Sequence, residues 1–389
     1  MQVRKAFVVV GTVALLLGVA IGACAQQSTI ITHISKEDMG LLLMEAPLAQ
    51  MQAFAAQESL RKEALRQLAE TLAMAVEAQR LGLLKDPMGI AQLEFMRTLA
   101  IAQAYDVVQR QGKSLPEFAS ITPEQVEAVN GLPETAEKFA NFVKIAQAGK
   151  ILPPGDIPEA QIARLKQDWI KLNLTAKKAE VEGFDKLRKT QLQVTLQQAT
   201  LLTQNYQRTL LPGQTNVSNG EVNAYIAVHP EYDIAPLRAK AEDLLLRIRA
   251  GEDFATLAKQ YTDDPGSKES GGFYDWFGRG RMVKEFENGA FGLRVGNVSG
   301  IVETQYGFHI IKTVGHRQKL NKETGKLEEE VQVRHILVST IAPPDPANPL
   351  APQLSLRDTA RAVIEKEKRT RILDGLILST GVIVPPDWL

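Results

Sequence analysis

Apolar residues recur every three or four positions in two early segments of the chain, which is the spacing of one face of a helix. The segments are residues 60–83, with Leu65, Leu68, Leu72 and Val76, and residues 86–108, with Leu93, Met96, Ala100 and Ala104. Gly82 stands where the first of these two helices would end. We expect these stripes to pack helix against helix rather than to hold a cofactor.

The helical pattern continues as far as His229. Thr122 and Ser218 each stand three positions before a Gln or Glu, an arrangement that caps the start of a helix. Residues 163–206 are rich in charge and in helix-forming residues, and they fit either one long helix or two. Near the C-terminus, Ser355 and Asp358 are placed to cap a last helix whose buried face contains Ala360, Val363, Ile364, Leu373, Leu376 and Ile377.

Between these helical parts the pattern changes to that of a small α+β block, residues 219–314. Residues 236–264 predict two short helices divided at Gly251, and glycines and aromatic residues follow closely. A glycine turn at Gly307 then precedes the β-branched stretch "GFHIIKTV". A further alternating stretch, "VQVRHILV" at residues 331–338, predicts another strand.

The net charge is zero, with 45 Lys and Arg against 45 Asp and Glu, so the overall charge does not favour nucleic acid as a partner. The first 24 residues differ in composition from the rest of the chain. Arg4 and Lys5 precede an uncharged apolar run that ends in small residues, which predicts a secretory signal, with an uncleaved membrane anchor as the alternative.

Cys24, at the end of this run, is the only cysteine. "IGAC" resembles the lipobox of bacterial lipoproteins, in which the cysteine is lipidated and anchors the protein to a membrane, whereas "ACA" also fits an ordinary cleavage site. Both interpretations stay open here. Neither leaves a disulfide pair, a catalytic thiol or a cysteine-based zinc site.

Three stretches together resemble the parvulin-type (PpiC) peptidyl-prolyl cis-trans isomerases. They are "GEDFATLAKQYTDDPGSKESGG", "GRGRMVKEFENGAFGLRVGNVSGIVETQYGFHIIK" and "VRHIL". The resemblance covers about a quarter of the chain. It implies a four-stranded antiparallel sheet surrounded by helices, cis/trans isomerisation of X-Pro bonds, and no metal or other cofactor.

The order of these stretches departs from the family, in which the "RHIL" strand comes first. We therefore expect a circular permutation: a hairpin delivers the late strand, 331–338, to its usual place beside "FHIIK". Alternation then puts His309 and His335 on one face, where they can form a cross-strand pair. The alternative is that the late strand opens a second, truncated isomerase domain.

The resemblance also implies a set of site residues. Asp264 stands where the family has Cys or Asp beside the substrate carbonyl, while His309 and His335 match a buried histidine pair that holds Asp264 and Thr304 in a hydrogen-bond network. A lone strand histidine is more often an ordinary core residue, and no third ligand has the spacing of a metal site.

The same resemblance implies an apolar pocket for the proline ring, formed by Met282 and Phe286 and flanked by Phe277. Two positions depart from the family: "GGFYDWF" puts Tyr274 where a leucine lines the pocket, and Tyr306 stands where a small or polar residue is common. Both could narrow the groove, so they put the substrate preference and the turnover in doubt.

The helical remainder resembles, more loosely, exported chaperones of the SurA and PrsA type, whose last helix packs on the first helices. We thus expect an α+β protein with a helical region built from both chain ends and a small isomerase domain. The expected segments are a signal at 1–24, a helical region at 25–216, the permuted domain at 217–340, and a linker with the returning helix at 341–389.

The predicted function is isomerisation and folding of exported polypeptides that contain X-Pro bonds, in the periplasm or cell envelope. One alternative is a holdase, which binds such segments without turning them over. Another is a membrane-attached scaffold, for which lipidated Cys24 and absent isomerase activity would be the evidence.

Overall fold

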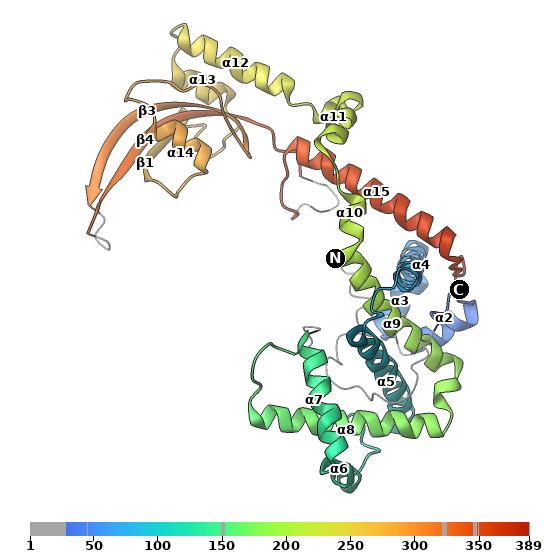
Figure 1. Cartoon of the computed structure of the whole chain (residues 1–389). Coiled ribbons are helices and arrows are strands. Elements are labelled where there is room, and N and C mark those ends of the chain that lie inside the picture. The colour runs from blue at the N-terminus through green and yellow to red at the C-terminus, as the bar shows by residue number, and fades with distance from the viewer. Residues whose placement is uncertain are drawn as a thin grey trace. The chain divides into compact units, whose positions relative to one another are not determined.

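The computed structural model describes residues 29–44, 46–148, 152–320, 325–344, 348 and 350–388. The predicted signal and the lipidation candidate Cys24 lie outside the described residues. Among the described helices, none combines the length and the hydrophobicity needed to cross a bilayer. The chain forms two compact units, 1–215 with 368–389, and 216–367 (Figure 1). The fold class is α+β, as expected.

The first unit is helical, and its helices gather around two apolar clusters. One cluster joins α5, α6, α7 and α8, and the other joins α2, α4, α9 and the end of α15. The helices are α2 (Lys36–Leu43), α3 (Leu48–Ala56), α4 (Glu58–Arg80), α5 (Pro87–Arg110), α6 (Pro123–Asn130), α7 (Pro133–Ala148), α8 (Glu159–Val181), η2 (Phe184–Lys186), α9 (Arg188–Thr209), α10 (Leu211–Thr215) and α15 (Leu356–Thr380).

The expected stripes are buried in these clusters: Leu65, Leu68 and Leu72 are each less than 5% exposed. Residues 163–206 form two helices, α8 and α9. They separate because Gly183, at φ +78°, adopts a left-handed conformation that ends helical geometry.

Both ends of the described chain meet in this unit. His33 and Ile383 form a parallel bridge, and Arg61 Nε lies 2.8 Å from Asp387 Oδ1. Leu373, on the last helix, packs in the same cluster as the α4 stripe. The last helix therefore returns to the first helices, as the looser resemblance implied.

The second unit contains the sheet. Its elements are α11 (Asn219–Val228), η3 (Pro230–Tyr232), α12 (Ala235–Arg249), α13 (Phe254–Tyr261), β1 (Phe273–Gly278), α14 (Lys284–Phe291), β2 (Val302–Thr304), β3 (Gly307–Leu320) and β4 (Leu327–Ser339). The start of α15, with Ile364, packs on Val217 and Val222 of this unit. The expected caps at Thr122, Ser218 and Ser355 are all present.

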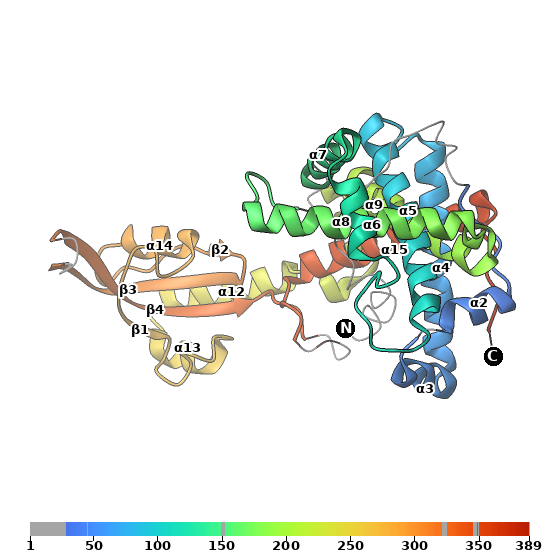
Figure 2. The same cartoon turned by 90° about the horizontal axis from the view of Figure 1, so that it is seen from below.

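The four strands are antiparallel in the order β1-β4-β3-β2. Helices α12 and α13 cover one face and α14 covers the other (Figure 2). The late strand β4 therefore lies between β1 and β3, in the same sheet, as the sequence predicted. It does not begin a separate domain.

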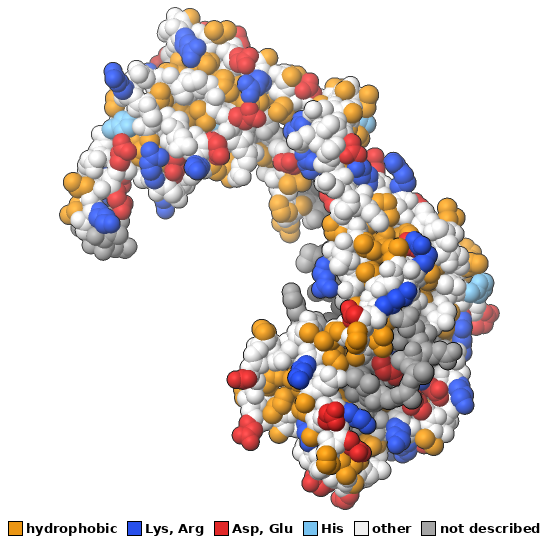
Figure 3. Space-filling view, in the orientation of Figure 1, with side chains coloured by type: hydrophobic (Ala, Val, Ile, Leu, Met, Phe, Trp, Pro, Cys, Tyr) orange, Lys and Arg blue, Asp and Glu red, His pale blue; other side chains and the backbone are white. Residues whose placement is uncertain are grey.

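Strands β3 and β4 continue beyond the sheet as a two-stranded ribbon. Where the ribbon leaves the sheet, a bulge lies between Thr313 and Gly315, and the ring of Trp276 packs so closely over Gly315 that an added Cβ would lie 2.6 Å from it. The Arg317 guanidinium lies 4.4 Å from the centre of that ring. Charged side chains of both signs are interspersed on the exposed ribbon (Figure 3).

Candidate active site

Two histidines from neighbouring strands lie together at the centre of the sheet. The strand register pairs His309 with Leu337 and Ile311 with His335, so the two histidines are diagonal neighbours rather than direct partners. Their rings are 5.6 Å apart and nearly parallel, and the two Nδ1 atoms are 3.4 Å apart. Both residues are buried, at 4% and 3% exposure.

The loop that carries Asp264 is fixed to the late strand. Thr262 follows α13 and is fully buried, and its hydroxyl accepts hydrogen bonds from the backbone N–H of Leu337 and of Asp264. Further along, the N–H of His335 donates to the carbonyl of Gly272 at 2.8 Å. Gly272 has φ +77°, and a Cβ there would lie 2.1 Å from the His335 carbonyl oxygen, so only glycine allows this approach.

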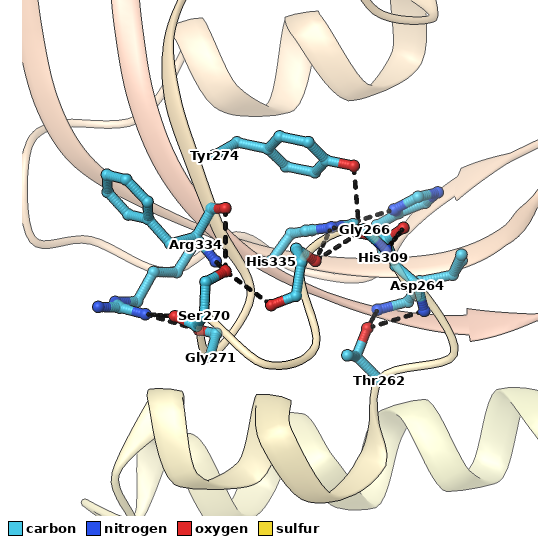
Figure 4. Close-up of polar contacts among 12 residues, drawn as sticks. Thr262, Asp264, Gly266, Ser270, Gly271, Tyr274, His309, Arg334 and His335 are labelled. Atoms are coloured by element: carbon cyan, nitrogen blue, oxygen red, sulfur yellow. Dashed lines mark hydrogen bonds and ion pairs between the residues drawn. The ribbon is translucent and has the colours of Figure 1, made fainter.

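The Asp264 carboxylate accepts four hydrogen bonds (Figure 4). Its Oδ2 accepts from His335 Nε2 at 2.9 Å, from the Tyr274 hydroxyl at 3.1 Å and from the Ser267 hydroxyl. Its Oδ1 accepts from the Gly266 N–H at 3.2 Å. These donors, His335 first, hold the pKa of Asp264 well below its usual range despite partial burial. The carboxylate is therefore ionised at neutral pH.

The polar contacts continue from Asp264 to β2. A carboxylate only accepts, so His335 donates to it through Nε2, and His335 Nδ1 lies 3.4 Å from His309 Nδ1. His309 Nε2 lies 2.9 Å from the Thr304 hydroxyl, and that hydroxyl oxygen accepts from the Tyr306 N–H at 3.1 Å. Each polar group in this chain of contacts thus has a partner.

Burial lowers the pKa of His309 to about 3, with a further contribution from His335. His309 is neutral at physiological pH, so one of its ring nitrogens donates and the other accepts. Burial, together with the negative Asp264, raises the pKa of Tyr274 to about 12. Tyr274 thus remains a hydroxyl donor.

An apolar wall stands beside the polar groups. The ring of Phe286, from α14, meets both histidine rings edge-on, at 5.3 Å from His309 and 5.4 Å from His335. Phe277 lies 6.3 Å from Phe286, and Met282 packs against the same apolar cluster. The Phe286 ring and the charged carboxylate of Asp264 therefore both lie against the histidine pair.

The two departures from the family differ in their surroundings. Tyr274 is partly buried, its ring lies 5.0 Å from that of His335, and its hydroxyl bonds to Asp264. Tyr306 is 46% exposed, and its backbone bonds to Thr304 and Thr340. The nine predicted catalytic and substrate-binding residues thus lie on the sheet, on α14 or in the loops beside them. In the described part of the chain, no group of three or more His, Cys, Asp or Glu is arranged to hold a metal ion.

Two polar residues of the site were missed by the sequence reasoning. Ser267 is fully buried, with its hydroxyl bonded to Asp264 and 3.0 Å from His335 Nε2. Glu287 is 6% exposed and accepts hydrogen bonds from the loop that carries Met282. Ser267 stands three residues after Asp264, a spacing at which the two side chains can bond within one turn, so a signal for it was available.

The chain matches known proteins in sequence. The PPIC-type PPIASE domain matches residues 223–317, so the match ends before β4. Foldase protein PrsA of Geobacillus sp. (strain WCH70) is 50% identical over 92 residues, which are 24% of this chain and 33% of that protein. Foldase protein PrsA of Caldanaerobacter subterraneus subsp. tengcongensis is 31% identical over 247 residues, 59% of this chain and 74% of that protein.

For three of the curated relatives, the match spans only about a third of their length, between 32% and 35%. A crystal structure of PrsA from Bacillus subtilis shares 19% identity and covers 67% of this chain and 90% of that chain. Its TM-score is 0.20, too low to carry an argument about structure.

Proposed function

This chain belongs to the PrsA foldase family, and from that premise we propose that it isomerises X-Pro peptide bonds and assists the folding of exported polypeptides. The observation that carries the proposal is the continuous chain of contacts from Thr304 through His309 and His335 to Asp264, with the Phe286 wall beside it. Buried polar networks with every member bonded are stiff, and they hold a charged group in one position.

The reaction requires little covalent chemistry. Resonance opposes rotation about the X-Pro bond with a barrier of about 18 to 20 kcal/mol, so a site must bind the twisted amide better than the planar forms. A ten-thousandfold acceleration corresponds to about 5.5 kcal/mol of such preference.

In this proposal, Met282 and Phe286, with Phe277, bind the prolyl ring, and Asp264 lies beside the carbonyl oxygen. A planar amide carries partial negative charge on that oxygen, and a twisted amide carries less. The ionised carboxylate therefore destabilises the planar forms more than the twisted one. The donors to Asp264 maintain its charge, and the histidines position it.

The substrates would be unfolded or newly exported chains that contain proline. Export to the periplasm or cell envelope is supported by the apolar run before residue 24, and lipidation at Cys24 would anchor the protein to a membrane. Labelling of the protein with a radioactive fatty acid in cells would test the anchor. A Cys24→Ser variant that is labelled equally would contradict it.

We also infer that the isomerase domain is circularly permuted. Two observations support this: the family match stops at residue 317, and β4 supplies the missing strand from the other end of the domain. An experimental structure with β4 outside the place between β1 and β3 would contradict the inference.

A holdase that binds proline-containing segments without turnover is the second candidate. Tyr274 and Tyr306 favour it, because both side chains are larger than those the family resemblance implies at these positions. The two functions differ in turnover, so a direct rate measurement separates them.

The experiment is exchange NMR on tetrapeptides with a central X-Pro bond, using wild type, Asp264→Ala and Met282→Ala. We expect wild type to accelerate exchange and each variant to lose about 10- to 100-fold of that acceleration, equal to about 1.4 to 2.8 kcal/mol in the transition state. Asp275→Ala is the matched control, because Asp275 is an exposed carboxylate on β1 and should leave the rate unchanged.

Circular dichroism should show that the variants remain folded. If folded wild type does not accelerate exchange for any of several residues before proline, the holdase becomes the better account. If Asp264→Ala retains full activity, the assigned role of the carboxylate is wrong.

A further inference from the structure

The loop between β1 and α14 is fastened to a single buried carboxylate. Three successive backbone N–H groups, of Gly280, Arg281 and Met282, donate to one oxygen of Glu287, at 2.6, 2.9 and 3.0 Å. Glu287 itself is in the first turn of α14 and only 6% exposed. Its hydrogen bonds therefore link the loop to the helix that follows it.

A carboxylate in such a position needs compensation, because removing a charge from water is costly unless it is hydrogen-bonded. Consecutive N–H groups that converge on one point form an anion-binding concavity, and hydrogen bonds to an ionised acceptor are about twice as strong as neutral ones. Gly280 contributes the necessary backbone shape with φ +87°, which side-chain-bearing residues rarely adopt. The loop conformation and the carboxylate therefore depend on each other.

The hydrogen bonds to Glu287 also affect the two apolar side chains, Met282 and Phe286, that are assigned to the proline ring. Met282, on the loop, supplies the third N–H, and Phe286, the residue before Glu287, faces both histidine rings. Met282 and Phe286 pack in one apolar cluster. A displacement of the Glu287 carboxylate would thus change the distance between the side chains assigned to the proline ring.

We propose that Glu287 is the positioning residue of the proline pocket: its carboxylate presets Met282 against Phe286, so that the substrate meets a formed pocket. This inference rests on the proposed function, because it concerns the same pocket. Glu287 acts through Met282 and the loop, and it does not touch the substrate. Its substitution should weaken peptide binding before it weakens the fold.

The test compares wild type, Glu287→Gln and Glu287→Ala as full-length chains. Glutamine keeps the shape and one accepting oxygen but loses the charge, whereas alanine loses all three hydrogen bonds. Glu285→Gln is the matched control, because Glu285 is an exposed acid in the same helical turn.

The first readout is the amide proton shifts of Gly280 and Met282, obtained by selective labelling of glycine and methionine with nitrogen-15. We expect upfield shifts in Glu287→Gln and larger ones in Glu287→Ala, because amide protons bonded to a carboxylate resonate downfield. The control should leave these shifts unchanged.

The second readout is the affinity for a tetrapeptide with a central Ala-Pro bond, together with separate values of kcat and KM. We expect KM and Kd to rise about threefold in Glu287→Gln and about tenfold in Glu287→Ala, with smaller changes in kcat and with folded spectra throughout. Partial retention of affinity by the glutamine variant distinguishes a positioning carboxylate from a general loss of structure.

Unchanged peptide affinity in a folded Glu287→Ala variant would overturn the proposal, and so would unchanged amide shifts. If wild type binds the peptide without turnover, isomerase activity is refuted, while Glu287 is still judged by Kd and amide shifts. If wild type binds no proline peptide, the pocket itself is wrong and this inference falls with it.

Discussion

The inner and outer halves of the β3–β4 ribbon share one pairing pattern but differ in what stabilises them. In the inner half Ile310, Ile311 and Val333 are fully buried between helices. In the outer half Leu320 and Leu327 are more than half exposed, and Glu330 forms cross-strand ion pairs with Arg317 and Lys319. Antiparallel pairing thus continues past the core, and only the inner half gains the burial that can hold a site rigid.

The largest expected effect tests the buried half. Ile310→Ala should lower the free energy of unfolding of the second unit by about 3 kcal/mol, because it removes a fully buried side chain that packs under α12. Leu320→Ala, in the exposed half, should change it by less than about 0.5 kcal/mol. Urea denaturation followed by circular dichroism measures both, and equal losses would remove the distinction between the halves.

Between pH 7 and pH 5, a smaller effect should come from the buried histidine. The pKa of His309 is about 3 in the folded state and about 6.5 in the unfolded state, so between these values the unfolded state binds a proton that the folded state does not. Stability should therefore fall as pH decreases through 6.5, by up to about 1.4 kcal/mol per pH unit, and the loss should level off below about pH 3.

Asp264 adds to this loss at lower pH. The pKa of Asp264 is depressed in the folded state. Its contribution to the free energy of unfolding is therefore present above the unfolded pKa, near 3.9, and is lost as pH falls toward the folded pKa.

The prediction for His309 is measured by denaturation of wild type and His309→Asn at pH 7, 6 and 5. We expect a flatter dependence in the variant, and identical slopes would show that His309 does not carry the effect.

The smallest expected effect belongs to the exposed half. Glu330→Gln removes the partner of Arg317 but leaves the packing of Arg317 on Trp276. Exposed ion pairs contribute little and are screened by salt, so the melting temperature should fall by no more than about 2 °C in low salt. In 0.5 M NaCl the difference should disappear. A larger, salt-independent loss would mean that the outer half is stabilised as the core is.

The alternating pattern of the sequence predicted which face of the sheet residues of the inner half occupy. It did not predict the strand register or the bulge. Alternation placed His309 and His335 on one face, since a period of two assigns each residue to a face. It did not predict that they lie diagonally, because the register is set by pairings such as Ile311 with His335, which involve both strands at once. The bulge near Gly315 likewise depends on Trp276, from another strand.

The polar contacts of the site were less accessible to sequence reasoning. The family resemblance supplied Asp264, but the hydrogen bond from Tyr274 to it depends on how β1 and the 262–272 loop meet around β4. A leucine in the family pattern gave no reason to expect a donor there. Glu287 was missed because an acidic residue in the first turn of a helix ordinarily faces solvent and interacts with the helix dipole.

The late position of β4 in the chain also affects when the domain can fold during synthesis. In the sheet, β1 has β4 as its neighbour, and β4 ends at Ser339, about 60 residues after β1 ends at Gly278. At about 5 to 20 residues per second of synthesis, β1 is complete for about 3 to 12 s before the strand beside it is. During that interval the 262–272 loop and β1 lack the strand that fixes them. The domain therefore closes when its last strand arrives rather than by growth from its first.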